Sequence, residues 1–464
     1  MNTTRTTGPH MSGLDPKRKR TRYAMVGFGG RTSMFLDPIV RDFREQAQLV
    51  ACCDTSFTRI NFQLNRVRTA YAAELEPKLF RADEFSRMLA ECKPDAVIVC
   101  SPDYTHGAYI VEALAAGCDV ISEKPMVTTA ESCRQVLEAA AQARGRLRVS
   151  FNYRWATGAS RVKEMLLDGV IGSVKQVSLD YFLDTMHGAD YFRRWHSEKA
   201  CSGGLIVHKS THHFDLVNWW LDAIPEEVFG FGSLAFYGKE NAVRRGDGKW
   251  TGYERYTGKA EKDDPFKMDL SQDDGMRGLY LDAEAETGYI RDRNVFRSGI
   301  DIEDTMSLLV RYRGGQQLNY SLVAYAPYEG YRVMFTGDRG RLEYEEIHGS
   351  HLITGQSDEE LAAQQKAGGR NIVIRVTPHF GKQQIIRVNP VAGAHGGADP
   401  QLQSAIFNRQ TNKDPLGRDA GPEQGAASIL VGAAANVSFA SNQPVRISAL
   451  CPLRPDASRL GELT

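Results

Sequence analysis

Apolar runs and amphipathic segments alternate regularly over the first third of the chain. A short apolar run bounded by turn-forming residues is typical of a buried parallel strand, and apolar residues at helical spacing indicate the helix that covers it. The expected strands are Tyr23–Phe28, Leu49–Cys53, Ala96–Cys100, Val120–Ser122 and Leu147–Phe151, and the expected helices are Glu84–Glu91, Ala108–Ala116 and Ala130–Ala143. This alternation predicts an α/β unit over residues 22–150, built as a doubly wound parallel sheet.

The pattern changes near Asn152, where apolar and polar residues begin to alternate at every second position. Such alternation is typical of half-buried antiparallel strands. Strands are expected at Val174–Phe182, Val228–Tyr237, Thr305–Tyr312, Gln317–Ala324 and Arg332–Thr336. We therefore predict an α+β domain over residues 151–445, with an open, mostly antiparallel sheet and an Ala-rich helix over Pro422–Ser438.

Three further segments differ from these two units. Residues 239–297 are charged and rich in Gly and Asp without a sustained periodicity, which favours an inserted surface excursion; a substrate lid is the alternative. The paired aspartates of this insertion lack the carboxylate spacing of a calcium-binding loop, so no metal is expected there. Residues 1–21 are expected to form a flexible N-terminus, and residues 446–464 a C-terminal tail.

Charge and composition exclude several classes of protein. The 464 residues include 57 Lys and Arg and 57 Asp and Glu, so the chain lacks the net field that usually drives binding to nucleic acid or to an anionic membrane. No run approaches the ~20 apolar residues that span a bilayer. The eight cysteines form no CxxC pair, which predicts a reduced, cytoplasmic protein.

The first chemical signal is a glycine-rich turn directly after the first strand. Glycines permit a tight turn whose backbone N–H groups approach a pyrophosphate, and the N-terminus of the following helix favours its negative charge. The predicted cofactor-binding residues of this turn are Gly27, Phe28, Gly29, Gly30, Arg31 and Thr32, where Thr32 replaces a usual third small residue. A plain strand-to-helix connection is the alternative for a glycine turn taken alone.

An acidic residue strengthens the cofactor interpretation. Asp54 ends the second strand, where a carboxylate accepts hydrogen bonds from ribose hydroxyls and repels a 2′-phosphate. The sequence therefore favours NAD over NADP, although Arg59 nearby keeps NADP open.

The second signal lies at the ends of the next two strands. Ser101, Pro102, Asp103 and His106 follow one strand, and Glu123–Lys124–Pro125 follows the other. Ligands bind at the carboxyl ends of parallel strands, so these residues are predicted to contact the cofactor. A lysine at this edge can have a lowered pKa and take part in proton transfer, whereas a solvated loop lysine is the alternative.

These residues carry a resemblance to the Gfo/Idh/MocA oxidoreductase family, named for glucose-fructose oxidoreductase and inositol dehydrogenase. The similarity covers roughly residues 22–237 and 300–445, and Glu123–Lys124–Pro125 is its most specific element. The resemblance implies a Rossmann domain followed by an open-sheet domain whose exposed face often mediates oligomers, hence a homodimer or homotetramer. It also implies that Lys124 contacts both the nicotinamide ribose and a substrate hydroxyl.

The third signal is a polar face containing His208, His212 and Asp215, whose spacings of four and three place them on one side of a helix. The resemblance implies that His212 and Asp215 line the substrate site, with His212 as general base or acid and Asp215 orienting it or binding a sugar hydroxyl. The sequence departs from the family pattern at His208 and at Ser210, so His208 competes for the proton. A divalent metal on this face and purely structural histidines are the alternatives.

Aromatic and basic residues near these segments suit a carbohydrate, because aromatic faces cover the C–H surface of a sugar and polar groups meet its hydroxyls. The predicted substrate contacts are Tyr153, Arg154, Arg194, Trp195, His196, Tyr325, Tyr328 and His395.

Together these patterns predict an NAD-dependent dehydrogenase acting on a secondary hydroxyl of a sugar, glycoside or cyclitol, with Lys124 and His212 in proton transfer and no metal. One alternative keeps the fold but cleaves glycosides through transient oxidation at C3, elimination, water addition and re-reduction, which requires a second base such as a Tyr, His208 or His196. Another is a non-catalytic dinucleotide-binding sensor.

Overall fold

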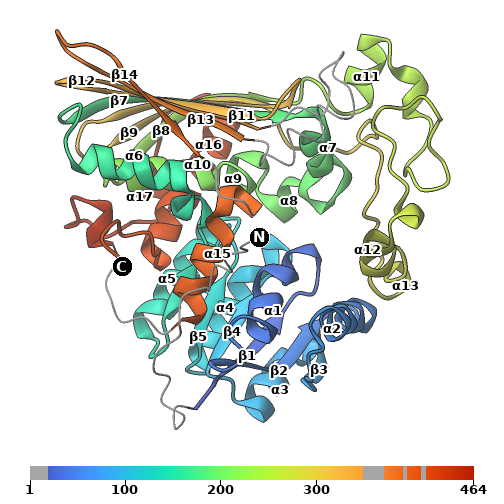
Figure 1. Cartoon of the computed structure of the whole chain (residues 1–464). Helices are drawn as coiled ribbons and strands as arrows, with labels where there is room; N and C mark the ends of the chain where they lie inside the picture. The colour runs from blue at the N-terminus through green and yellow to red at the C-terminus, as the bar shows by residue number, and fades with distance from the viewer. Residues whose placement is uncertain (1–18, 349–369, 390–393, 409–413, 464) are drawn as a thin grey trace, which may run out of the picture.

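A computed structural model describes residues 19–348, 370–389, 394–408 and 414–463 of the chain. It contains two sheets, one in each half of the molecule, which lie one above the other in Figure 1. The predicted flexible N-terminus falls almost entirely outside the described residues, and the first strand begins at Thr21.

Sheet A, the N-terminal sheet, is six-stranded and wholly parallel, in the order β3-β2-β1-β4-β5-β6. Its strands are β1 (Thr21–Val26), β2 (Ala47–Asp54), β3 (Lys78–Arg81), β4 (Ala96–Val99), β5 (Asp119–Ser122) and β6 (Leu147–Val149). The helices that connect them are α1 (Ser33–Val40), α2 (Phe57–Tyr71), α3 (Phe85–Cys92), α4 (His106–Ala115) and α5 (Ala130–Gln142). The strand order reverses beside β1, which is where doubly wound sheets bind ligands, so the predicted α/β fold is confirmed.

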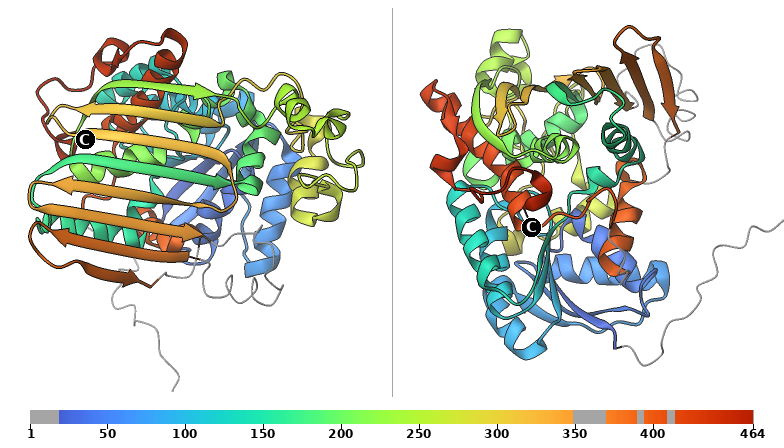
Figure 2. Two further views of the ribbon diagram at one scale, coloured as in Figure 1. Left: turned by 90° about the horizontal axis from the view of Figure 1, so that it is seen from above. Right: turned by 90° about the vertical axis from the view of Figure 1, so that its left-hand side faces the viewer.

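Sheet B is nine-stranded and open, in the order β14-β13-β12-β11-β7-β10-β9-β8-β15. Its strands are β7 (Val174–Asp184), β8 (Pro225–Ser233), β9 (Thr305–Tyr312), β10 (Gln317–Ala326), β11 (Gly330–Gly337), β12 (Gly340–His348), β13 (Arg370–Pro378), β14 (Gln384–Val388) and β15 (Val445–Arg446). Only the β7–β10 pair among these described strands is parallel, which confirms the mostly antiparallel prediction. The left view of Figure 2 looks onto one face of this sheet, with helices behind it.

Helices between the two sheets fill the interior. They include α6 (Thr157–Leu167), α7 (Thr185–Arg193), α8 (Lys199–Ser202), α9 (Leu205–His208), α10 (Thr211–Leu221), α16 (Pro422–Ser441) and α17 (Ile447–Leu450). Small residues on α16 allow close packing: a Cβ on Gly432 would fall 2.5 Å from the carbonyl oxygen of Ile206. The helix therefore lies directly against the segment that carries the predicted histidines.

The insertion over residues 239–297 does not simply extend over the surface. It consists of α11 (Lys239–Arg245), short helical turns at Gly248–Thr251 and Leu270–Gln272, α12 (Asp274–Met276), a π-helical turn η8 (Arg277–Leu281) and α13 (Glu284–Thr287). In Figure 1 it leaves sheet B beside α11 and descends to α12 and α13, which lie next to α2 of the N-terminal domain. The insertion thus bridges the two domains.

A second segment of the C-terminal half also returns to the N-terminal domain. Helix α15 (Ala394–Phe407) packs on α1 and on the turn at Asn152–Trp155. Within the described ranges, the helices include none long and apolar enough to cross a bilayer. All eight cysteines are free thiols.

Candidate active site

The glycine turn after β1 is too crowded for any other residue at its first position. Gly27 has a φ of +92°, and a Cβ there would lie 2.3 Å from the backbone nitrogen of Ser101. Thr32 fills the place of the third small residue and donates a hydrogen bond from Oγ1 to the Gly27 carbonyl at 3.2 Å. The turn is therefore braced from within, and it brings the ends of β1 and β4 together.

Asp54 lies beside this turn, as its place at the end of β2 predicts. Its carboxylate accepts hydrogen bonds from the backbone N–H of Phe28 at 2.6 Å and of Ser56 at 2.8 Å. Burial raises its pKa, and these two N–H donors oppose the rise. Asp54 thus joins the second strand to the glycine turn.

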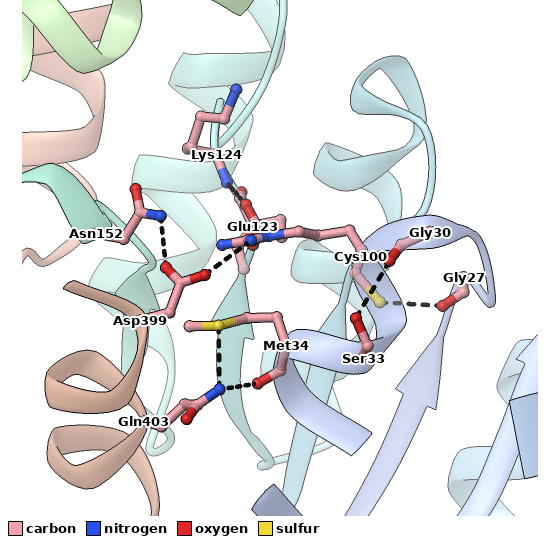
Figure 3. Close-up of polar contacts among 12 residues, drawn as sticks. Gly27, Gly30, Ser33, Met34, Cys100, Glu123, Lys124, Asn152, Asp399 and Gln403 are labelled. Atoms are coloured by element: carbon pink, nitrogen blue, oxygen red, sulfur yellow. Dashed lines mark hydrogen bonds and ion pairs between the residues drawn. The ribbon is translucent and has the colours of Figure 1, made fainter. Parts of the chain in front are cut away.

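A network of four polar side chains supports the loop that carries Lys124 (Figure 3). Arg31 donates from Nε to Glu123 Oε1 at 2.5 Å and from Nη1 to Asp399 Oδ2 at 3.3 Å. Asn152 donates to the other Asp399 oxygen at 2.8 Å. Asp399 lies within α15, which begins at Ala394. It ties the C-terminal segment to the cofactor domain.

Lys124 lies next to this network of polar side chains. Its backbone N–H donates to Glu123 Oε2 at 3.0 Å, and its Nζ donates to the carbonyl oxygen of His208 at 3.1 Å. Burial lowers the pKa of Lys124 to about 8, while the carboxylates of Asp103 and Glu123 act in the opposite direction. The lysine thereby reaches from sheet A to the segment that carries the histidines.

Asp103 and His208 form a buried pair. The His208 ring bonds through Nδ1 to Asp103 Oδ2, and burial raises the pKa of Asp103 and lowers that of His208. Burial thus disfavours the charged form of each group, and the hydrogen bond between them offsets part of this cost. The His208 Nδ1 is therefore committed to Asp103.

His106 was predicted to meet the cofactor, but both of its ring nitrogens lie 2.8 Å from carbonyl oxygens, those of Pro125 and Ser101. Ser101 in turn shares a hydrogen bond with Thr105 at 2.6 Å between their hydroxyl oxygens. His106 therefore connects the loop that begins at Ser101 and Pro102 to the loop of Lys124, and it does so from a buried position.

His208, His212 and Asp215 do not share one helix. Helix α9 ends at His208 and α10 begins at Thr211, because the Ser210 backbone and hydroxyl both donate to the Leu205 carbonyl in a wide turn. The expectation of a single three-residue face is wrong for this reason. His212 lies in the first turn of α10 and stacks on the ring of Tyr153, with 4.1 Å between centroids.

Asp215 and Arg154 are bound to each other. Arg154 donates to both carboxylate oxygens of Asp215 at 2.9 and 2.6 Å, and the two side chains are 0% and 1% exposed. Arg154 also donates to Gln424 Oε1 at 2.8 Å. The predicted roles of Asp215 beside His212 and of Arg154 at the substrate stay predictions. The pair anchors α10 beneath His212.

The structure separates the other predicted substrate contacts into two groups. Trp195 stacks on His196 at 3.6 Å between centroids, and the His196 ring lies edge-on to His208 at 4.2 Å, so these residues adjoin the Lys124 segment. Tyr325 instead stacks on Phe236, and Tyr328 packs edge-on against Phe182. Both tyrosines thus pack on other aromatic rings, and their predicted contact with substrate stays a prediction. The side chain of His395 lies outside the described part of the structure.

Two family models match this chain: the NAD-binding Rossmann fold of an oxidoreductase family over residues 21–151, and the C-terminal alpha/beta domain of the same family over residues 163–447. The chain belongs to the Gfo/Idh/MocA oxidoreductase family. The predicted resemblance and the prediction of an enzyme are both confirmed.

Relatives of this Gfo/Idh/MocA protein include YteT of Bacillus subtilis, named as an oxidoreductase, which is 39% identical over 434 residues, 90% of this chain and 95% of that protein. D-glucoside 3-dehydrogenase of Escherichia coli is 33% identical over 134 residues, 28% of this chain and 35% of that protein. The WlbA dehydrogenase from Bordetella pertussis, solved in complex with NADH and UDP-GlcNAcA, shares the fold with a TM-score of 0.58 at 17% identity, covering 94% of this chain and 99% of that one.

The residues of this Gfo/Idh/MocA member fit a dinucleotide. The Gly30 N–H lies at the place where a pyrophosphate is expected, and it donates a hydrogen bond to the Tyr280 hydroxyl at 3.1 Å.

Sequence reasoning missed His187 at this site, and it gave Lys209 and Tyr191 no specific role. Lys209 is buried and donates from Nζ to Tyr153 Oη at 3.2 Å. Tyr191 and His187 are linked at 3.1 Å, and His187 Nδ1 lies 2.8 Å from Glu329 Oε2. The spacing of four between His187 and Tyr191 on α7 was a usable signal, but Glu329 comes from a distant loop. Within the ranges that the structure covers, no cluster of three His, Cys, Asp or Glu suits a metal ion.

Proposed function

We propose that this oxidoreductase uses NAD to oxidise a secondary hydroxyl of a sugar, glycoside or cyclitol. The observation that carries the proposal is the contact between Lys124 Nζ and the His208 carbonyl, which joins the lysine at the carboxyl edge of sheet A to the segment of His212. A titratable amine and an imidazole on facing domains are the groups that an alcohol needs when it loses a proton and a hydride. The glucoside dehydrogenase among the relatives supports a carbohydrate substrate.

NAD supplies the hydride acceptor when it is bound. The substrate hydroxyl gives its proton to His212, and Lys124 assists by holding the same oxygen and relaying the proton. The Tyr153 ring fixes the plane of the imidazole by stacking, and Lys209 fixes the Tyr153 hydroxyl. A positioned base of this kind contributes about 10²–10⁴-fold to the rate.

Asp54 supports NAD rather than NADP. Its carboxylate is held at the end of β2 by the backbone N–H groups of Phe28 and Ser56, and it would repel a 2′-phosphate there. Arg59 is directed elsewhere, since its Nε donates to the Leu279 carbonyl at 2.9 Å. We expect tighter binding of NAD than of NADP in a direct titration, and equal affinities would contradict this assignment.

Lys124→Ala tests the proposal. We expect NAD to bind within a few-fold of the wild-type affinity, because the glycine turn and Asp54 are untouched, while hydride transfer to NAD from a panel of inositols, hexoses and glucosides is lost. Arg161→Ala is the control, because Arg161 is an exposed residue that pairs with Glu164 on α6. Unchanged turnover in Lys124→Ala would remove the lysine from the mechanism. A wild-type protein that binds NAD but oxidises no member of the panel would favour a sensor.

A redox-neutral glycoside cleavage is the second candidate, and the relay from Glu329 through His187 to the Tyr191 hydroxyl favours it. The Tyr191 ring lies 5.4 Å from that of His208, so it offers a second proton-transfer group near Lys124. Stoichiometry distinguishes the two: a dehydrogenase accumulates NADH with its product, whereas the glycosidase releases sugar while NAD stays oxidised.

We also propose a homo-oligomer formed through sheet B. Phe231 and Leu309 lie on neighbouring strands with 60% and 56% of their surface exposed, and paired apolar side chains on a sheet face are typical of an interface. Sedimentation at micromolar concentration is expected to give a dimer or tetramer, and Leu309→Glu is expected to weaken it.

A further inference from the structure

The insertion over residues 239–297 reaches the glycine turn of the other domain. Tyr280 of η8 places its hydroxyl 3.1 Å from the Gly30 nitrogen, and a Cβ on Gly30 would lie 3.3 Å from that hydroxyl. Gly30 belongs to the turn that binds a pyrophosphate in Rossmann domains. A segment some 250 positions later in the chain therefore stands at the cofactor site.

The insertion is held in this position by specific contacts with α2. Arg59 Nε donates to the Leu279 carbonyl at 2.9 Å, and the Thr58 hydroxyl donates to Glu286 Oε1 at 2.6 Å. Gly278 fits against the Phe62 ring, because a Cβ on that glycine would fall 2.3 Å from it. Figure 1 and the left view of Figure 2 both place this part of the insertion alongside α2. The insertion is thus held on α2 by a hydrogen bond to a backbone carbonyl, a hydrogen bond between side chains and the close fit of a glycine against an aromatic ring.

Positive charge gathers around Tyr280. The guanidinium carbons of Arg59 and Arg291 lie 5.6 and 5.5 Å from the centre of its ring. Arg291 Nη2 donates to Asp190 Oδ1 at 2.6 Å, and Arg194 Nη1 donates to the other Asp190 oxygen at 3.1 Å. Arg291 and Arg194 thus share one carboxylate, which leaves an excess of one positive charge on these three groups, and Arg59 adds another guanidinium beside the Tyr280 ring.

Several of these donors are buried without an acceptor. The Arg291 side chain is only 6% exposed, yet its Nε and Nη1 have no hydrogen-bond partner among the described residues. Within the same described residues, Arg194 Nε and Arg59 Nη2 are also buried without one. Unpaired buried donors on charged groups are unfavourable, so the cluster suits an anion with several acceptor oxygens.

We propose that the insertion supplies the second half of the dinucleotide site, in which Tyr280, Arg291 and Arg194 bind the pyrophosphate opposite the glycine turn. This rests on the proposed use of NAD. The pyrophosphate is negatively charged, which suits the excess positive charge of the cluster, and its oxygens supply the missing acceptors. The dinucleotide is then enclosed between α2 and the insertion, and it leaves slowly because the docked insertion must move first.

Direct binding measurements test this assignment. NAD and ADP-ribose, which contains the pyrophosphate but no nicotinamide, are titrated into wild type, Tyr280→Phe, Arg291→Gln and Arg291→Lys, and their dissociation rates are followed by displacement. The control is Arg277→Gln, because Arg277 lies on the same η8 but is half-exposed and pairs with Asp274. Thermal unfolding of each variant verifies that it is folded.

We expect Arg291→Gln to bind both ligands about 10–100-fold more weakly, in keeping with loss of a charge-assisted phosphate contact. Tyr280→Phe should release both ligands several-fold faster. The affinity of Arg291→Lys should lie between those of Arg291→Gln and wild type, and Arg277→Gln should match wild type in both affinity and release rate. Unchanged affinity and release in folded Arg291→Gln and Tyr280→Phe would overturn the inference. So would a rise confined to the KM of the sugar, which would assign the cluster to the substrate. A wild-type protein that binds neither ligand would instead overturn the proposed function.

Discussion

At the scale of single residues, the pKa of Lys124 links the structure to a measurable pH dependence. Burial lowers it to about 8, so the side chain loses its proton within the range accessible to kinetics. Because the neutral amine assists deprotonation of the alcohol, kcat/KM for oxidation should fall about tenfold per pH unit below pH 8 and level off above it. Rate profiles of wild type and of a weakly active Lys124 variant check this, and persistence of the same limb without the lysine would assign it to another group.

Replacing Glu123 gives a second test of the role of the Lys124 pKa in the pH profile. Its carboxylate raises the pKa of Lys124 against the effect of burial. Glu123→Gln removes that negative charge, so the acidic limb of the pH profile should move to lower pH. Glu138→Gln, an exposed change on α5, serves as the control and should leave the limb in place. A shift to higher pH would show that the carboxylate acts in another way.

His212 can be altered with little change in packing. Phenylalanine keeps the stack on Tyr153 but removes both ring nitrogens. We expect His212→Phe to lower kcat by about 10²–10⁴-fold while NAD affinity and thermal stability stay close to wild type. Single-turnover measurements with the best substrate give this value, and a kcat within threefold of wild type would exclude His212 as the base.

At the scale of elements, α10 depends on a buried ion pair. Asp215 on this helix and Arg154 on the turn at Asn152–Trp155 are joined by two hydrogen bonds and are almost fully buried. Asp215→Ala leaves a guanidinium buried without its carboxylate, so the free energy of unfolding should fall by about 3–5 kcal/mol. Urea titration measures this loss, and Arg154→Met with Asp215→Leu should recover much of it. Lost turnover with unchanged stability would restore Asp215 to a catalytic role.

The elements also show where sequence patterns succeed and fail. The periodicity of apolar residues located β1, β2, β4 and most of sheet B, because each strand buries a regular face. It did not separate α9 from α10, since the break depends on where Ser210 directs its hydrogen bonds. The glycine turn and the Lys124 loop were predicted because local chemistry defines them. The partners of Asp215, Tyr325 and Tyr280 were not, because they come from segments far away in the chain.

At the scale of the whole molecule, the two domains meet around the cofactor site through both the insertion and α15. A ligand bound at that junction stabilises the folded chain by about 2.7 kcal/mol at 100 times its Kd. For a chain of this size we expect a rise in Tm of about 3 °C on saturation with NAD. Calorimetry should show both domains unfolding at the higher temperature. A rise limited to one of two separate transitions would mean that the domains are not coupled by the cofactor.

The contact of Asp399 with Arg31 and Asn152 has a bearing on how the protein is made. Sheet A can pair its strands as soon as residue 150 has left the ribosome, since all six lie in that stretch. The carboxylate that completes the support of the proposed catalytic lysine is synthesised some 250 residues later. A nascent chain therefore acquires the cofactor domain early but its finished active site only after α15 has been made, and a chain truncated before α15 should fold in part yet remain inert.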